Sequence, residues 1–449
     1  MLIAATFSLL ATTLAPQNPA ASTQDAKPIL AKRDQKTLAD KLRKYLTAEI
    51  KYDSSSGKAR EKASKARRKT KDSFDKDWAK ADAKGVLGSM ADLKVVFHNC
   101  FTNKRPDVGK GNFYMRDVAE TPFKYGLQIP KKYSEKNPWT TVVVLPSGKA
   151  GTWTKPKDYF AKVWAGTSLL QTAIVLIPML PQGLEMDAIP DYSRDGAEKD
   201  EQRRIGSVFS SFGFIMNNYN VDRSRVFLDC ATENNGYGVR LASLFPDRWA
   251  GIILRDPTEV DDIRIGSLLS VPVLAIETSA NAARVAALKT RWDETCPGMF
   301  TVIKGKGATP HLASAPEIEA WMKDKTRTMT PTKITLEPNH DRFNKAYWVS
   351  IRVADSLQTA SPDKKPRLQV VADRAANRIT VDAQGVERFE VLLNDDLIDL
   401  NKEFTIVING KAIKETRRRS FRDMKRRMME RNDWSYLFPV SYIATVPKE

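Results

Sequence analysis

The chain has 449 residues, a formal net charge of +18 and an apolar fraction of 42%. That length allows about two or three domains, and the apolar fraction is ordinary for a globular protein. No apolar run reaches the roughly 20 residues that a membrane-spanning helix needs, which excludes that class of protein. The basic balance favours contact with nucleic acid, anionic lipid or acidic polysaccharide without choosing among them, and a solvated basic surface is the alternative.

Residues 1–22 have the features of a secretory signal. An apolar stretch from Leu2 to Leu14 precedes the small residues Ala20, Ala21 and Ser22, which suit a cleavage site. The positive charge that normally comes first is missing, so a misassigned start or an apolar tail is the alternative. We predict export to the periplasm, the cell surface or the extracellular space.

Residues 23–90 are predicted to form a basic helical arm. One helix is indicated by apolar residues at helical spacing, namely Leu38, Leu42, Tyr45, Leu46 and Ile50. Residues 54–57 interrupt that pattern, and a second helix over 58–83 has few apolar anchors besides Phe74 and Trp78. We expect the second helix to be exposed or packed on a partner.

Residues 91–328 alternate between strand and helix patterns. Continuous apolar runs, which suit strands buried on both faces, occur at 140–145, 172–179, 226–229, 250–254, 271–276 and 300–303. Helical patterns lie between them at 159–170, 202–219, 236–244 and 282–292, and a last helix at 317–325 follows Pro316. An alternating strand at 123–133 precedes the series. This order predicts an α/β domain with a mostly parallel, doubly wound sheet.

Residues 329–449 are predicted to form a β-sandwich domain. Short alternating strands occur at 346–353, 367–371, 378–381, 389–393, 404–408 and 440–446. Asn409–Gly410 is a hairpin turn signal. A basic helix at 417–431 carries a stripe of Phe421, Met424 and Met428. The stripe indicates core packing with a solvated face, or else binding to an anionic surface.

The chain has three cysteines, Cys100, Cys230 and Cys296, and three histidines. The cysteines lack CxxC spacing and have no histidine at metal-ligand spacing, so no metal site and no cofactor are predicted. Two alternatives remain: one disulfide with one free thiol, or three buried thiols.

The segment 226–253 indicates a strand, a sharp turn, a helix and a second strand. That layout resembles the nucleophile elbow of the α/β-hydrolase superfamily. Together with the segments 123–133, 220–228 and 245–251, it resembles secreted esterases of the polyhydroxybutyrate-depolymerase and feruloyl-esterase type. The resemblance covers roughly residues 123–325 and implies an α/β-hydrolase-like fold.

The resemblance also implies positions for a catalytic site. Thr232 falls at the nucleophile, Asn281 at the acid and His311 at the base. The amides of Gly148 and Glu233 fall at the oxyanion donors.

This chain departs from the family at most of those positions. The family turn is Gly-x-Ser-x-Gly, but Cys230 and Asn234 replace both glycines and threonine replaces the serine. Asn281 is an amide where the family has a carboxylate, and Asp256 and Glu277 are substitutes on neighbouring strand ends. The elbow holds its central residue at positive φ, which a β-branched side chain adopts rarely. We therefore predict that the turn has relaxed and that Thr232 is structural.

These observations support three hypotheses about function. The first is a catalytically lapsed hydrolase that acts as a binding or structural module, with another protein or an anionic polymer as its partner. The second is an active carboxylic-ester hydrolase or peptidase with an unconventional site at Thr232 and His311. The third is an anion-binding protein that uses its basic segments. The sequence does not identify a substrate or an oligomeric state.

Overall fold

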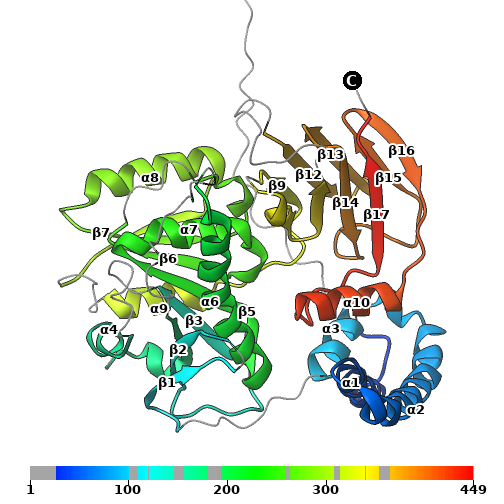
Figure 1. Cartoon of the computed structure of the whole chain (residues 1–449). Coiled ribbons are helices and arrows are strands. Elements are labelled where there is room, and N and C mark those ends of the chain that lie inside the picture. The colour runs from blue at the N-terminus through cyan, green and yellow to red at the C-terminus, as the bar shows by residue number, and fades with distance from the viewer. Residues whose placement is uncertain are drawn as a thin grey trace, which may run out of the picture.

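The computed structural model describes residues 27–100, 109–119, 121–145, 156–164, 166–179, 184, 190, 192, 194–257, 263–307, 314–338, 340–352 and 365–447. The predicted signal at residues 1–22 lies outside them. Figure 1 shows a central sheet flanked by helices, a second β-rich unit beside it, and a group of helices below that β-rich unit.

The central sheet has eight strands in the order β1-β2-β4-β3-β5-β6-β7-β8. The strands are β1 (Phe113–Asp117), β2 (Lys124–Gln128), β3 (Trp139–Leu145), β4 (Ala173–Pro178), β5 (Val221–Ala231), β6 (Gly251–Arg255), β7 (Val273–Glu277) and β8 (Phe300–Lys304). β2 is antiparallel to both β1 and β4, and the remaining pairs are parallel. The predicted mostly parallel, doubly wound sheet is confirmed.

Helices cover both faces of this sheet. They are α4 (Pro156–Val163), α5 (Leu169–Thr172), α6 (Ala197–Asn218), α7 (Asn235–Leu244), α8 (Ala282–Thr295) and α9 (Ala315–Lys323). Because strand side chains alternate between faces, Val143 and Leu145 of β3 pack with α6, α7 and α8. Val142 and Val144 pack with α4, α5 and α9 on the other face. Burial on both faces explains why the strands have continuous apolar runs.

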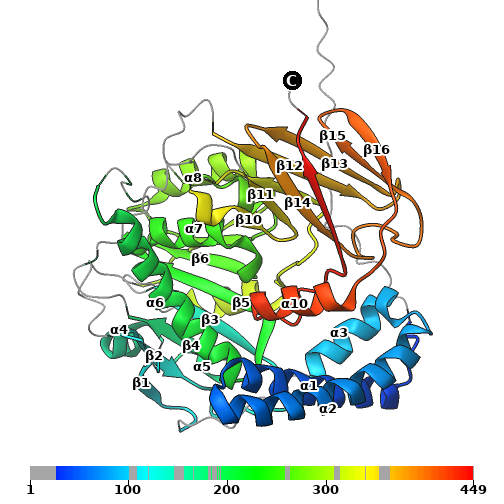
Figure 2. The ribbon, with the colours of Figure 1, turned by 45° about the vertical axis from the view of Figure 1, so that its right-hand side comes forward.

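The N-terminal helices form a bundle and are not an isolated arm. The bundle contains α1 (Lys32–Asp53), α2 (Gly57–Asp82) and α3 (Met90–Asn99), and it shares one apolar core with α10 (Phe421–Arg431). Phe421 of α10 contacts both Phe74 and Trp78 of α2, with ring centroids 5.2 and 4.1 Å apart. The partner of α2 is thus a helix from the far end of the same chain. In both views α10 lies between the β-rich unit and α1–α3 (Figures 1 and 2).

The C-terminal strands form two sheets around a separate core. The sheets have the orders β10-β11-β14-β17 and β16-β15-β13-β12-β9. The strands are β9 (Lys333–Leu336), β10 (Lys345–Ala346), β11 (Val349–Arg352), β12 (Arg367–Asp373), β13 (Arg378–Gln384), β14 (Arg388–Leu393), β15 (Phe404–Ile408), β16 (Lys411–Glu415) and β17 (Val440–Thr445). Asn409 and Gly410 both have positive φ, 44° and 82°, as a two-residue hairpin turn requires. The predicted sandwich and its hairpin are confirmed.

Short 3₁₀ helices complete the described elements: η1 (Val86–Gly88), η3 (Thr232–Asn234), η4 (Pro246–Arg248), η5 (Gly266–Leu268) and η7 (Asp341–Phe343). All three cysteines are buried and free, which settles the open choice in favour of three thiols. No helix among the described residues is both long and apolar enough to cross a lipid bilayer.

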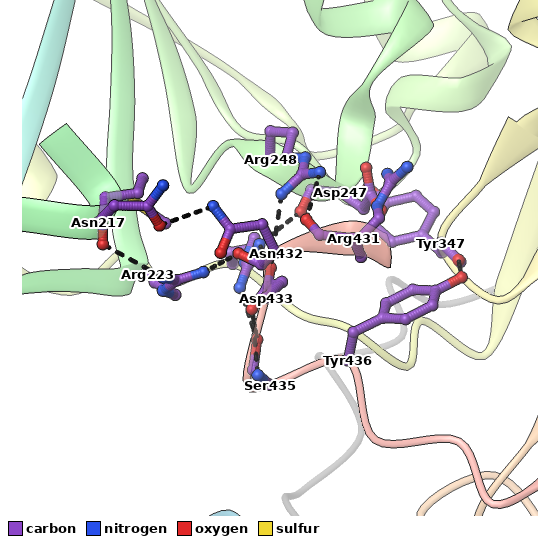
Figure 3. A network of polar contacts seen from close by, with 12 residues as sticks. Asn217, Arg223, Asp247, Arg248, Tyr347, Arg431, Asn432, Asp433, Ser435 and Tyr436 are labelled. Carbon is purple, nitrogen blue, oxygen red and sulfur yellow. Dashed lines mark hydrogen bonds and ion pairs between the residues drawn. The ribbon is translucent and has the colours of Figure 1, made fainter. Parts of the chain in front are cut away.

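A buried polar network joins the three units where α10 ends (Figure 3). Asp433 accepts a hydrogen bond of 2.7 Å from Nη1 of Arg327 and lies 3.8 Å from Nη1 of Arg248. Arg431 pairs with Asp247 of η4. Arg223 of β5 donates to the carbonyl of Asn432, whose positive φ of 49° ends α10. These contacts connect residues up to about 200 positions apart, so the C-terminal segment holds the helical bundle and the sandwich to the central sheet.

Candidate active site

The strand-to-helix turn after β5 keeps the backbone geometry of a nucleophile elbow. β5 ends at Ala231, η3 spans Thr232–Asn234 and α7 begins at Asn235. Thr232 has a φ of 42°, in the left-handed region that β-branched residues adopt rarely. The prediction that this turn has relaxed is therefore wrong. The surrounding packing holds Thr232 in a conformation that typically costs about 1–3 kcal/mol.

The packing around Cys230 explains how the turn forms without its flanking glycines. A Cβ atom added to Gly238 of α7 would lie 2.1 Å from the Sγ of Cys230. The helix can therefore approach the strand closely because residue 238 has no side chain, although position 230, where the resemblance expects a glycine, carries one. Burial raises the pKa of the Cys230 thiol well above its usual value, so this thiol stays protonated and is a poor nucleophile.

Asn235, the first residue of α7, ties the turn to the end of the neighbouring strand. Its Nδ2 atom donates to the carbonyls of Thr232 at 2.6 Å, Arg255 at 3.0 Å and Asp256 at 3.3 Å. Asp256 follows β6 and also has a positive φ, 48°. One buried amide thus brings the nucleophile position and the end of β6 together.

At the acid position, the side chain of Asn281 is used by local contacts. Its Oδ1 accepts a hydrogen bond from the amide of Thr278 at 2.7 Å. Its Nδ2 donates to the carbonyl of Ile276 at 3.2 Å and to the Asp256 carboxylate at 3.3 Å. The residue is only 6% exposed. Glu277, the other nearby carboxylate, pairs with Lys304 on the adjacent strand.

A buried ion pair lies at the ends of β5 and β6. Both carboxylate oxygens of Asp229 accept from Nε of Arg255 at 2.8 and 3.0 Å, and Nη2 of Arg255 donates at 2.7 Å. The guanidinium lies 5.5 Å from the ring centroid of Trp164 in the segment after α4. Burial raises the pKa of the nearby Tyr159 hydroxyl. Sequence reasoning missed this pair, although a charged residue at the end of each apolar run was the available signal.

The structure brings some of the proposed site residues together and leaves others undescribed. Thr232, Asn281 and Asp256 meet at the carboxyl edge of the sheet through the contacts given above. His311 and Gly148 lie outside the described residues, and so does the side chain of Glu233. Within the described part of the chain, no group of three His, Cys, Asp or Glu side chains could hold a metal ion.

Comparison with solved structures finds hydrolases. A thermostable esterase shares 15% identity with a TM-score of 0.35, over 48% of this chain and 63% of its own. A dienelactone hydrolase from Anabaena variabilis shares 18% identity with a TM-score of 0.32, over 48% of this chain and 99% of its own. A ferulic acid esterase shares 12% identity with a TM-score of 0.34, over 48% of this chain and 98% of its own. This chain thus spans less than two thirds of the thermostable esterase.

No protein-family model matches the chain, and no curated protein matches its sequence. The α/β-hydrolase-like fold is assigned from the strand order of the central sheet and from the strand–turn–helix segment around Thr232. A fold of this kind carries many functions and does not by itself imply activity.

Proposed function

We propose that the protein is a catalytically lapsed α/β-hydrolase-like protein whose central domain acts as a binding or structural module. The observation that carries the proposal is the amide of Asn281 at the acid position, with three hydrogen bonds to its own sheet edge. An amide cannot stabilise a protonated imidazole as a carboxylate does. Replacing the acid of a serine-protease triad by its amide lowers kcat by about 10⁴.

The nucleophile position supports the same proposal. Thr232 carries a β-branched hydroxyl where the resemblance expects a serine, and the extra methyl group restricts the rotation that aims the oxygen. Cys230, two residues earlier, offers only a buried and protonated thiol. Neither side chain provides the freely aimed, activated nucleophile that acyl transfer needs.

The test is labelling with a fluorophosphonate probe, combined with hydrolysis of short nitrophenyl esters. We expect no labelling and no ester hydrolysis for the natural chain, for Thr232→Ala or for His311→Ala. Thr290→Ala, an exposed threonine on α8, is the matched control. Clear turnover that Thr232→Ala and His311→Ala abolish and Thr290→Ala retains would contradict the proposal.

A second candidate function is an active ester hydrolase or peptidase, and two observations favour it. Thr232 keeps the left-handed backbone of an elbow, and the Asp256 carboxylate contacts the amide at the acid position. In this candidate Thr232 is the nucleophile, His311 the base and Asp256 the acid. Asp256→Asn would then lower kcat by about 10⁴, whereas Asp324→Asn after α9 would leave it unchanged.

For the partner, we propose an anionic polymer that contacts the first half of α2. Residues 58–71 contain eight Lys and Arg against one Glu, and all but Arg67 of these basic residues are exposed. Retention on heparin that falls steeply with salt is the expected result. The charge reversals Lys65→Glu and Arg68→Glu should abolish it, while Lys131→Glu and Lys132→Glu, exposed outside α2, should not. Equal retention of both pairs of variants would reject this partner. Export stays a prediction.

A further inference from the structure

The outward face of α2 carries a straight line of lysines, which we call the lysine stripe. Consecutive residues of an α-helix are about 100° apart around its axis and about 1.5 Å apart along it. On that geometry, six exposed lysines fall within a sector of about 60° and extend over about 33 Å. They are Lys58, Lys62, Lys65, Lys69, Lys76 and Lys80. Phe74 and Trp78 lie on the opposite side of the helix and face the bundle core.

Most of the stripe has no carboxylate partner. Across the described part of the chain, its first five lysines make no ion pair, and Lys80 lies 3.9 Å from Asp77. Asp77 is itself paired with Lys41 of α1 at 2.5 Å. The charged residues that flank the stripe are Glu61, Arg68 and Asp72. The six lysines and Arg68 thus face only three carboxylates, one of which already pairs with Lys41.

The residue types of α2 provide charge and little else. The helix contains no Asn or Gln, and its aromatic residues, Phe74 and Trp78, face the core. Single-stranded nucleic acids are held by aromatic side chains on which the bases stack. Base edges are read mainly by Arg, Asn and Gln, and the stripe itself contains none of these. The stripe therefore suits a polyanion that has no bases.

The straightness of the stripe favours a single extended chain over a duplex. One turn of duplex DNA is about 34 Å long, which is close to the length of the stripe. Each phosphate strand winds once around the duplex over that distance, so it faces a straight line of lysines along only part of it. An extended single chain can contact all six lysines in turn.

The spacing of the lysines also bears on the kind of chain. Successive lysines of the stripe are about 4.5–10.5 Å apart along the helix axis. This spacing is similar to one or two sugar units and is longer than the repeat of a polyphosphate. Figure 2 shows α1 and α2 along the lower margin of the molecule, where a long polymer can lie along the helix.

We propose that the lysine stripe binds one extended chain of an acidic polysaccharide, whose sulfate or carboxylate groups contact the lysines one after another. The inference rests on the anionic partner proposed above for α2, and it specifies the chemistry and shape of that partner. It is independent of whether the elbow at Thr232 is active.

The test is fluorescence anisotropy of labelled polyanions with the full chain, at one salt concentration because such affinities depend on salt. A heparin dodecasaccharide is longer than the stripe, and a heparin tetrasaccharide is shorter. A polygalacturonate oligosaccharide carries carboxylates alone, and duplex DNA and polyphosphate are the comparison polymers. We expect the dodecasaccharide to bind at least about tenfold more tightly than the tetrasaccharide, since more contacts form at once. We also expect it to bind more tightly than the duplex or polyphosphate.

Variants locate the binding along the stripe. Lys76→Gln should weaken the dodecasaccharide by about threefold, the loss of one exposed ion pair. It should leave the tetrasaccharide unchanged, because the shorter chain still fits between Lys58 and Lys69. Lys58→Gln combined with Lys76→Gln should weaken the dodecasaccharide by about tenfold. Lys131→Gln combined with Lys132→Gln, exposed between β2 and β3, removes the same charge and should have no such effect.

The outcomes separate this inference from the proposal on which it rests. Absence of binding to all of these polymers would reject both the anionic partner of α2 and the stripe. Three results would overturn the stripe and leave an anionic partner standing. They are a tetrasaccharide that binds as tightly as the dodecasaccharide, a duplex or polyphosphate that binds as tightly, and equal effects of the two double variants. Circular dichroism checks that the variants are folded.

Discussion

The carboxylate of Asp433 should be one of the most important single groups for the stability of this chain. Its side chain is 1% exposed, and it lies within 4 Å of both Arg327, at 3% exposure, and Arg248. Its other oxygen accepts hydrogen bonds from the amide of Ser435 at 3.0 Å and from the Ser435 hydroxyl at 2.6 Å. Asp433→Asn keeps the shape of the side chain but removes the charge. Because donors face both carboxylate oxygens, the new amide NH2 group meets either the guanidinium hydrogens or the Ser435 donors.

The variant should be less stable because the buried guanidinium groups of Arg327 and Arg248 lose a carboxylate partner. Removing one partner of a buried pair typically lowers the free energy of unfolding by about 3–5 kcal/mol. Asp396→Asn is the matched control, because Asp396 pairs with Lys94 at 3.3 Å near the surface, and such a pair contributes at most about 1 kcal/mol. Urea unfolding followed by tryptophan fluorescence and by circular dichroism compares the variants, with two probes because several units need not unfold together.

The pH dependence of stability provides a second test of the interaction between Asp433 and the arginines. Burial opposes the charge on Asp433, but the attraction of Arg327, Arg223 and Arg248 outweighs it and holds the pKa of the carboxyl well below its usual range. The unfolded pKa is near 3.9. The stabilisation is therefore complete above roughly pH 4 and is lost as the pH falls through the folded pKa. The difference between natural chain and variant should shrink below pH 4. A cost below about 1 kcal/mol at pH 7, equal to the control, would refute the reasoning.

Three further predictions concern the turn and the thiols. Thr232→Gly should be about 1 kcal/mol more stable than Thr232→Ala, because positive φ is unfavourable for residues with a Cβ atom. In an ordinary helix or strand the glycine variant would be the less stable of the two. Thermal unfolding in which Thr232→Ala is the more stable variant would contradict the φ of 42°. Gly238→Ala should cost about 1–3 kcal/mol by overpacking against Cys230, and adding Cys230→Gly should restore part of it; equal stability of the single and double variants in urea would disprove that contact. Burial raises the pKa of both Cys100 and Cys296 to about 12, so a thiol-specific disulfide reagent at pH 8 should react only after unfolding, and rapid reaction of the native chain would contradict this burial.

The order of strands and helices in the central domain could be predicted from the sequence because each element has its own local pattern. Strands buried on both faces are continuously apolar. The helix predicted at residues 282–292 has apolar residues at helical spacing, and the structure shows this helix as Ala282–Thr295. The Asn409–Gly410 hairpin was likewise predictable, since these residue types accept positive φ. β1 was missed because it is a five-residue strand without a clear alternation of apolar and polar residues. α3 was missed although Met90, Leu93, Val96 and Phe97 lie at helical spacing.

The candidate site could be located from the sequence but its geometry could not. The position of Thr232 follows from the strand–turn–helix pattern, yet local steric preference pointed to a relaxed turn. Gly238, six residues further on, makes room for Cys230, and Asn235 holds the turn against the end of β6. A preference of about 1–3 kcal/mol is small beside the packing that opposes it, so the strained backbone persists.

The sequence by itself determined the period and burial of each element and the sandwich that follows the α/β domain. It also placed Thr232 and Asn281 where the resemblance expects a serine and an acid. Only the tertiary structure decided that α10 completes the core of α1–α3, and that Asp433 joins arginines about 100 to 200 residues away. The physical reason is the range of the interactions. Periodicity reflects backbone sterics over a few residues, whereas the partner of a buried charge or an apolar stripe depends on which distant segment packs against it.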